Sequence, residues 1–454
     1  MNTIKLFLYY ILFIVVLCTA CGGDPFLEIK PSEPVNVFNE QINAVDVYID
    51  CSGSMKGYVV FENKDAEIAN QAFKYIVPLF INNVINQIGE ISIYRDINGV
   101  IDAVIKDGQP RVTVFFNHLI SGDFFSGSAT ELDGMISRIV ERTKEDSTRL
   151  SVLITDAILS FGPAKLRNDR MYNINNKAIL KSNIHNALLC DTSLSISIVK
   201  YLSDFNGKYY WNCKEDNREF QGKLMNNRPF YLFLIGKKEL VSALLSTENL
   251  LPPSEGVFTV TNPVELEVAL FKKKLEQGKG KLNSIVNVTD RRGVISATTS
   301  YERNKDKVFI IGIKKSNVPR AYYRDERDFF SNLKCDNKNV IIEKLGDVNG
   351  IDGIDEKVSN PNRVQNYDYF YKITLNKEMF AGNLQNKELE FYFEPSLDVK
   401  ESHTDKDYDL DDRHDTLYHK TWGFNLITEA VKAAHPNKQP QGARFTLTLN
   451  RIIK

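Results

Sequence analysis

Apolar runs of strand length alternate with stretches of helical period over the first half of the chain. Continuous apolar runs are typical of strands buried on both faces of a sheet, and they predict strands at residues 45–50, 90–94, 112–116, 151–156, 194–202 and 230–235. Between these runs apolar residues recur about every 3.6 positions, which predicts helices over residues 65–87, 131–145, 177–189 and 238–245. This alternation predicts a doubly wound, mostly parallel, Rossmann-like α/β domain over residues 44–250.

The second half of the chain has a different pattern. It begins after residues 250–256, a break that contains prolines and a glycine. Short runs rich in β-branched and aromatic residues then follow one another with turn residues between them, and residues 422–434 are the main stretch of helical period. We therefore expect residues 257–454 to be β-rich and to form a β-sandwich, or two small ones with an inserted loop.

The first twenty residues are expected to be a targeting signal. A short positive start precedes an apolar run over residues 6–17, which is short for a membrane span and typical of a secretion signal. The run ends in "LCTAC", which resembles the lipobox of bacterial lipoproteins, although Cys18 stands where that family usually has leucine. The resemblance implies cleavage before Cys21, lipidation of Cys21 and attachment to a membrane of the bacterial cell envelope, at the outer membrane or cell surface. An ordinary secreted protein and an uncleaved anchor are the alternatives.

A proline-containing tether over residues 21–43 is expected to join this anchor to the α/β domain. Four further cysteines follow, and Cys190 and Cys213 are the candidate disulfide pair of an exported chain. Unpaired buried thiols are the alternative. None of these four cysteines belongs to a CxxC motif, which argues against a structural zinc site in this part of the chain.

Composition and charge exclude some classes of function. The chain has 454 residues, of which 43% are hydrophobic and 25% charged, as in an ordinary globular protein. Its net charge is −1 and it has no long basic run, which argues against nucleic acid as the main partner. The sequence does not determine the oligomeric state.

Polar side chains suited to metal binding follow two of the predicted strands. Asp50 ends the first strand, and Ser52 and Ser54 follow it at alternate positions. Asp156 ends a second apolar strand, and Thr130 lies in a Gly/Ser loop before a predicted helix. Sites in open α/β sheets form outside the carboxyl ends of the strands. Carboxylates and hydroxyls together form an all-oxygen set that suits a hard cation such as Mg²⁺ and suits zinc poorly.

The order of these residues, Asp-x-Ser-x-Ser, then a loop threonine, then a strand-end aspartate, resembles the von Willebrand factor type A domain with its metal-ion-dependent adhesion site. The resemblance covers residues 44–250. It implies that Ser52, Ser54 and Thr130 offer hydroxyl oxygens to Mg²⁺, with Mn²⁺ and Ca²⁺ as alternatives, and that Asp50 and Asp156 hold the metal directly or through water. It also implies that an acidic side chain of a partner protein fills an open coordination position.

Each of these residues also has an ordinary structural interpretation. Asp50 can cap the helix that follows its loop, Thr130 can be an N-cap with Asp133 three residues on, and Asp156 can pair with Lys165 or Arg167. Ala157 and Ala129 stand where the family often has glycine, and both are small. Three such features in the family's order, at predicted sheet ends, favour the metal site.

The remaining motifs do not indicate an enzyme. The acidic stretch 347–356 fails the register of a calcium loop, and the histidines within residues 403–419 lie in a segment that looks solvated. Neither a nucleophile elbow nor a P-loop is present. We therefore expect a metal-dependent protein-binding module on a lipoprotein. A metal-dependent hydrolase, and a structural envelope protein with a non-functional metal site, are the alternatives.

Overall fold

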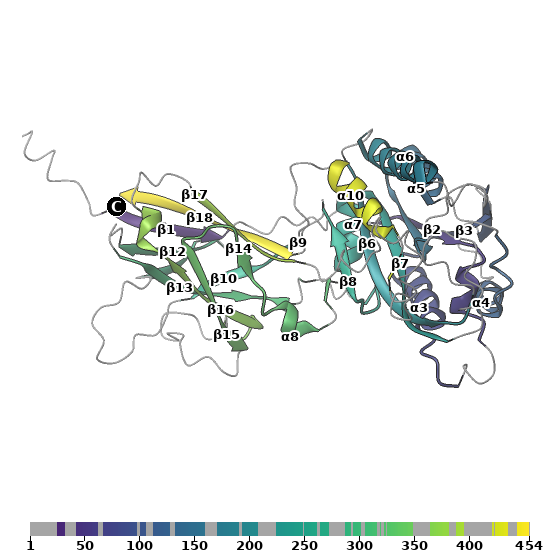
Figure 1. Cartoon of the computed structure of the whole chain (residues 1–454). Helices are drawn as coiled ribbons and strands as arrows, with labels where there is room; N and C mark the ends of the chain where they lie inside the picture. The colour runs from purple at the N-terminus through teal and green to yellow at the C-terminus, as the bar shows by residue number, and fades with distance from the viewer. Residues whose placement is uncertain are drawn as a thin grey trace, which may run out of the picture.

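The structure is a computed structural model and comprises an α/β lobe beside a β-rich lobe (Figure 1). It describes residues 25–31, 42–61, 67–97, 100–105, 112–127, 132–158, 170–189, 193–207, 224–247, 249–260, 264–271, 287–291, 294–300, 305–315, 318, 322–323, 325–347, 364–380, 387–394, 420–421, 423–434 and 443–453. The expected signal, Cys21, Cys190, Cys213 and Thr130 lie outside these residues.

A seven-stranded sheet runs through the α/β lobe in the order β4-β3-β2-β5-β7-β6-β8. Its strands are β2 (Ala44–Asp50), β3 (Ile91–Ile97), β4 (Val100–Ile105), β5 (Arg149–Thr155), β6 (Leu194–Phe205), β7 (Met225–Lys237) and β8 (Gly256–Thr259). All residues of β2 are buried, because helices cover both faces of this part of the sheet. The continuous apolar run at residues 45–50 therefore reflects burial on both faces, as expected.

The expectation of a doubly wound, mostly parallel, Rossmann-like sheet is wrong. Only β2 pairs in parallel with its neighbours, β3 and β5. The pairs β3–β4, β5–β7, β6–β7 and β6–β8 are antiparallel. β7 lies between β5 and β6 and runs against both of them. A continuous apolar run shows that a strand is buried on two faces, but burial does not determine the strand's direction, so the prediction of direction failed.

The helices of this lobe divide between the two faces of the sheet. They are α3 (Ala72–Gln87), α4 (Val112–Ser121), α5 (Leu132–Glu145), α6 (Arg170–Leu189) and α7 (Lys238–Ser246). Buried side chains of α3, α4 and α7 share a hydrophobic cluster with Val47 and Ile49, while those of α5 and α6 share another with Tyr48 and Leu153. The strand expected at residues 112–116 is wrong, because α4 buries Phe115 and Leu119 at a helical spacing of four residues.

The β-rich lobe contains two sheets. The first has the order β11-β12-β1-β18-β17-β14, and β9 also pairs with β18. Its strands are β1 (Pro25–Pro31), β9 (Val264–Glu265), β11 (Asn287–Arg291), β12 (Val294–Ser300), β14 (Lys334–Cys335), β17 (Lys387–Phe393) and β18 (Ala443–Ile453). The second has the order β10-β13-β16-β15, formed by β10 (Val268–Phe271), β13 (Lys307–Ile313), β15 (Val340–Asp347) and β16 (Tyr369–Leu375). Every described pair except β9–β18 is antiparallel.

Each lobe also contains a segment from a distant part of the chain. β1 lies within residues 21–43, the expected tether, yet it pairs with both β12 and β18 as an inner strand. Helix α10 (Phe424–Ala434) belongs to the C-terminal half but packs on α6 of the α/β lobe (Figure 1). Phe424 stacks on Tyr231 of β7 with ring centroids 4.4 Å apart. Both lobes therefore depend on residues far apart in sequence.

Two shorter helices, α8 (Glu326–Phe329) and the 3-10 helix η8 (Lys377–Phe380), belong to the β-rich lobe, and a 3-10 turn, η2 (Met55–Tyr58), follows β2. Among the described residues, Cys51 and Cys335 are free thiols. No helix in the described part of the chain has the length and apolar character needed to cross a membrane.

Candidate metal site

The carboxylate of Asp50 is held at the carboxyl end of β2 by two hydrogen bonds. β2 and β5 are parallel neighbours with Ile49 opposite Ile154, so their ends lie side by side. The Thr155 hydroxyl donates to Asp50 Oδ2 at 2.7 Å, and the Ser52 backbone N–H donates to Asp50 Oδ1 at 2.9 Å. Asp50 is only 1% exposed. These bonds fix the direction of the carboxylate, whose oxygens are each able to accept more than one bond.

The two serines after Asp50 point toward one another. Ser52 Oγ and Ser54 Oγ are 3.0 Å apart, and both residues are buried. Their loop turns directly into η2, where the Gly57 N–H donates to the Ser54 carbonyl at 3.1 Å. Gly53, between the serines, is exposed. The pair of hydroxyls therefore lies just beneath a part of the loop that solvent can reach.

The loop that leads to the predicted Thr130 is fastened to this same stretch. Gly53 N–H donates to the Gly127 carbonyl at 2.9 Å, and Gly127 N–H donates to the Cys51 carbonyl at 2.8 Å. A Cβ at Gly127 would lie 2.9 Å from that Cys51 oxygen, so this close approach of two backbones requires glycine. Thr130 itself lies outside the described residues, so its predicted role as a ligand is not tested.

Asp156 is the most unusual carboxylate of the site. It is fully buried, and its Oδ1 accepts the Ile158 N–H at 3.1 Å. Its Oδ2 has no hydrogen-bond partner among the described residues. Burial, and next the negative charge of Asp50, raise the pKa of Asp156 to about 6, while the positive charge of Arg228 opposes this shift. The Ser54 hydroxyl is close enough to lower the same pKa, so the four predicted residues that the structure describes converge.

The turn after β5 directs the Asp156 side chain. Ala157 has a φ of 54°, in the left-handed region that residues with a Cβ seldom adopt. This conformation lets the Ala157 N–H donate to the Thr155 hydroxyl at 3.0 Å. Thr155 thus fixes both the Asp50 carboxylate and the turn that carries Asp156. Its role was missed from the sequence, although a hydroxyl residue directly before a strand-end aspartate was the available signal.

Arg228 at the start of β7 is a second residue that the sequence did not single out. Its side chain is among the largest fully buried ones, with 1% exposure, and its guanidinium lies 5.0 Å from the centre of the Phe205 ring. Burial raises the pKa values of Asp156, Tyr58 and Tyr231, and the positive charge of Arg228 opposes each of these shifts. An arginine at the edge of an apolar run resembles an exposed strand end, so its burial could not be read from the sequence.

These residues fit a hard cation better than any softer metal. The buried Oδ2 of Asp156 lacks a hydrogen-bond partner among the described residues. The Ser54 hydroxyl acts on the Asp156 carboxylate and lies 3.0 Å from the Ser52 hydroxyl. A set of ligands whose donor atoms are all oxygen suits Mg²⁺, Mn²⁺ or Ca²⁺. The described residues contain no group of three or more His, Cys, Asp and Glu side chains arranged for a metal. The candidate site has two carboxylates, Asp50 and Asp156, and its other oxygens come from serine hydroxyls. It is therefore a different kind of group from one built of three or more such side chains.

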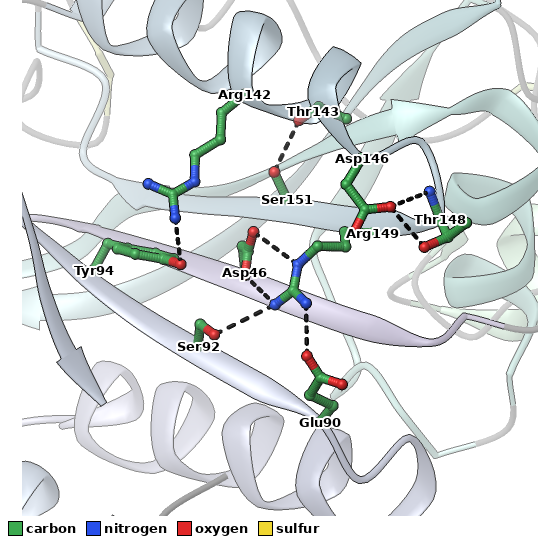
Figure 2. A network of polar contacts seen from close by, with 10 residues as sticks. All are labelled: Asp46, Glu90, Ser92, Tyr94, Arg142, Thr143, Asp146, Thr148, Arg149 and Ser151. Carbon is green, nitrogen blue, oxygen red and sulfur yellow. Dashed lines mark hydrogen bonds and ion pairs between the residues drawn. The ribbon is translucent and has the colours of Figure 1, made fainter. Parts of the chain in front are cut away.

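A larger polar network lies at the opposite end of β2 (Figure 2). Arg149 at the start of β5 donates to both oxygens of Asp46, at 2.6 and 3.2 Å, and to Glu90 at 2.6 Å. Arg142 of α5 donates to the Tyr94 hydroxyl at 2.6 Å. These charges neutralise one another across β2, β3 and β5, so we assign the network to holding the sheet together rather than to binding a ligand.

No family model matches the chain, and neither does any curated protein or solved structure. The function of the chain must therefore be argued from its own residues and their geometry.

Proposed function

We propose that Asp50, Ser52, Ser54 and Asp156 form a metal-dependent adhesion site that binds an acidic side chain of a partner protein. Thr130 is the fifth ligand in this proposal, and Mg²⁺ is the metal, with Mn²⁺ and Ca²⁺ as alternatives. The proposal concerns the loops at the end of β2 and β5 and resembles the site of von Willebrand factor A domains. The observation that carries it is the buried Asp156 Oδ2, which has no hydrogen-bond partner among the described residues.

The free energy of the buried carboxylates supports this proposal. A buried polar atom without a partner costs about 1–3 kcal/mol, and an ionised carboxylate costs more. Asp156 bears this cost beside Asp50, whose negative charge makes ionisation of Asp156 still less favourable. A divalent cation between the two carboxylates would remove both penalties. The site is therefore costly to the metal-free fold and is explained by a ligand of positive charge.

The residues of the site have different roles in metal binding. Asp50 is immobilised by Thr155 and by the Ser52 N–H, so its carboxylate is held in a fixed direction. The paired hydroxyls of Ser52 and Ser54 supply neutral oxygens. Bound Mg²⁺ would supply an electrophilic position for an anionic oxygen. Because Gly53 and Ser126 beside the site are exposed, a partner's carboxylate can approach from this side.

Thermal unfolding of the purified chain tests metal binding. Mg²⁺ at about 100 times its Kd should stabilise the protein by about 2.7 kcal/mol relative to EDTA. Asp156→Asn should abolish this shift. Asp204→Asn is the matched control, since Asp204 is also a buried carboxylate but both of its oxygens accept backbone N–H groups, from Asn70 at 2.7 Å and from Asn227 at 3.0 Å. It should lower stability and keep the Mg²⁺ shift.

An absent Mg²⁺ shift in the wild-type protein would refute the proposed metal site. Partner binding is tested separately by co-purification from envelope extracts with Mg²⁺ or with EDTA. A protein retained in EDTA, or retained by Asp156→Asn, would show that recognition does not use the metal. Hydrolysis of generic phosphate or carboxylic esters that is lost in Asp156→Asn would identify a metal-dependent hydrolase instead.

We also propose that the chain is a lipoprotein of the bacterial cell envelope, because "LCTAC" resembles a lipobox that ends in Cys21. Wild-type protein should incorporate labelled palmitate and sediment with the membranes. Cys21→Ser should lose the label and leave the membrane fraction. Equal labelling of the two proteins would refute lipidation at Cys21.

A further inference from the structure

We propose that Arg228 is a built-in countercharge that keeps the metal-loaded site net positive, so that its last coordination position selects an anionic group. This inference rests on the proposed function, and it assigns a role to a residue outside the predicted ligand set. It concerns charge and not the identity of the metal. It also explains why a large cationic side chain is buried beside a site for a cation.

The strand register places Arg228 and Asp156 on the same face of the sheet. Ile154 of β5 lies opposite Leu232 of β7. Side chains on one face alternate along a strand. Asp156 is two residues after Ile154 and Arg228 four residues before Leu232, so both belong to the face on which Ile154 and Leu232 are buried.

The contacts of Tyr58 bring Arg228 and the loop of the two serines together at that face. Tyr58 ends the turn that begins after Ser54, and its hydroxyl donates to the carbonyl of Pro229, the neighbour of Arg228, at 2.6 Å. Its ring packs edge-on against Phe205, 5.0 Å away. The Arg228 guanidinium lies over that same Phe205 ring. The loop of the two serines and the start of β7 are therefore linked through the packed rings of Tyr58 and Phe205.

Burial at this position demands a nearby anion. A guanidinium remains charged in proteins, and burying a charge without compensation costs several kcal/mol. Arg228 is 1% exposed, and its charge acts on the carboxylate of Asp156, which is fully buried. The two side chains therefore compensate one another in part, although no described residue forms a hydrogen bond with Asp156 Oδ2.

The balance of charges gives this pair a consequence for ligand choice. Asp50 and Asp156 together carry two negative charges, and Arg228 restores one positive charge. Addition of a divalent cation then leaves one net positive charge, which a single carboxylate neutralises. Without Arg228 the loaded site would be neutral, and a carboxylate would make it negative in a water-poor environment, which is unfavourable.

The countercharge should act in opposite directions on the metal and on the anion. Its positive charge repels the cation, so Arg228→Met should bind Mg²⁺ more tightly, by about tenfold or more. The same substitution should weaken binding of a carboxylate to the loaded site. Damage to the packing would weaken both, so a rise in Mg²⁺ affinity distinguishes a charge effect from a structural one. Arg228→Lys keeps the charge and should stay near the wild-type affinity.

Calorimetric titration of the chain with Mg²⁺ alone measures the first effect, at about pH 8, which is well above the ordinary pKa of a carboxyl group. Repeating the titration in sodium acetate and in sodium perchlorate of equal ionic strength measures the second. Acetate should raise the apparent Mg²⁺ affinity of the wild type and of Arg228→Lys but not of Arg228→Met. An Mg²⁺ affinity of folded Arg228→Met equal to or below the wild-type value would overturn the inference.

The outcomes separate this inference from the proposed function. A wild-type protein that binds no Mg²⁺ refutes both, whereas one that binds Mg²⁺ with an unchanged or weaker Arg228→Met refutes only the countercharge. If Arg228→Met does not fold, the double variant Asp156→Asn/Arg228→Met removes both charges of the pair and should regain the folded state. Failure of the double variant to fold, while Asp156→Asn alone folds, would contradict compensation between the two side chains.

Discussion

The hydroxyl of Thr155 donates a hydrogen bond to Asp50 Oδ2 at 2.7 Å and accepts one from the Ala157 N–H at 3.0 Å. One buried side chain thus joins the end of β2 to the turn after β5. The two carboxylates of the proposed site depend on this link for their relative position. Thr155 is not one of the residues predicted from the sequence, yet in the structure it connects Asp50 to the turn that carries Asp156.

Replacement of Thr155 tests this link. Thr155→Val keeps the shape but removes the donor to Asp50 and the acceptor for Ala157, so it should lower the free energy of unfolding by about 1–3 kcal/mol. It should also weaken Mg²⁺ binding, because Asp50 is no longer fixed. Urea unfolding and Mg²⁺ titration measure the two effects. Thr155→Ser retains the hydroxyl and should lose much less, and equal losses in both variants would assign the effect to packing.

The dependence of stability on pH should reveal the buried Asp156. Its pKa is raised from 3.8 to about 6 by burial and by Asp50. A raised pKa stabilises the protonated folded form, so this contribution is complete below about pH 3.8 and is lost as the pH rises through about 6. The loss should reach up to about 3 kcal/mol. Urea unfolding in EDTA at several pH values should show it in the wild type relative to Asp156→Asn.

Mg²⁺ should reverse the direction of this pH dependence. Binding of the metal requires the ionised carboxylate, so in Mg²⁺ the wild-type protein should gain stability over the same interval. Asp156→Asn should show neither trend. A wild-type curve parallel to that of Asp156→Asn in EDTA would show that the Asp156 pKa is not raised.

The close approach of two loops at Gly127 gives a prediction about shape. Gly127→Ala would place a Cβ 2.9 Å from the Cys51 carbonyl oxygen and should push the loops apart. We expect a loss of about 1–3 kcal/mol in the free energy of unfolding and weaker Mg²⁺ binding. Gly53→Ala is the control, because a Cβ at Gly53 would lie 3.4 Å from the Gly127 carbonyl oxygen, which is an ordinary van der Waals distance. A Gly127→Ala protein as stable as Gly53→Ala would contradict the described backbone contact.

Helix α10 should stabilise the α/β lobe although it comes from the C-terminal half. Phe424 stacks on Tyr231, whose hydroxyl donates to Thr421 Oγ1 at 3.1 Å. Phe424→Ala should cost about 3–5 kcal/mol, measured by urea unfolding. Lys181→Ala is the control. It removes a surface ion pair between Lys181 of α6 and Glu429 of α10 and should cost no more than about 1 kcal/mol. Equal small losses would mean that α10 does not anchor this lobe.

Local pattern predicted much of the α/β lobe. The buried strands at β2, β3, β5, β6 and β7, and the helices α3, α5, α6 and α7, are confirmed, because burial on one or two faces leaves a periodic apolar pattern in the sequence. The strand predicted at residues 112–116 was wrong, since β-branched and aromatic residues also occur on the buried face of a helix. The direction of β7 was wrong as well, since β7 runs against both β5 and β6, because pairing is decided by neighbours that are distant in sequence.

The order of residues also singled out Asp50, Ser52, Ser54 and Asp156, because a carboxylate at the end of a buried strand is conspicuous in the sequence. Their convergence and the role of Thr155 became visible only in the structure, where β2 and β5 lie side by side. The same holds for Asp156 Oδ2, which has no hydrogen-bond partner in the described part of the chain. Arg228 entered the site through an antiparallel strand that local pattern had oriented wrongly. The sequence by itself determined which residues carry oxygen ligands and which segments are buried. Only the tertiary structure decided which charges face one another, because electrostatic coupling depends on distance in space and not on separation along the chain.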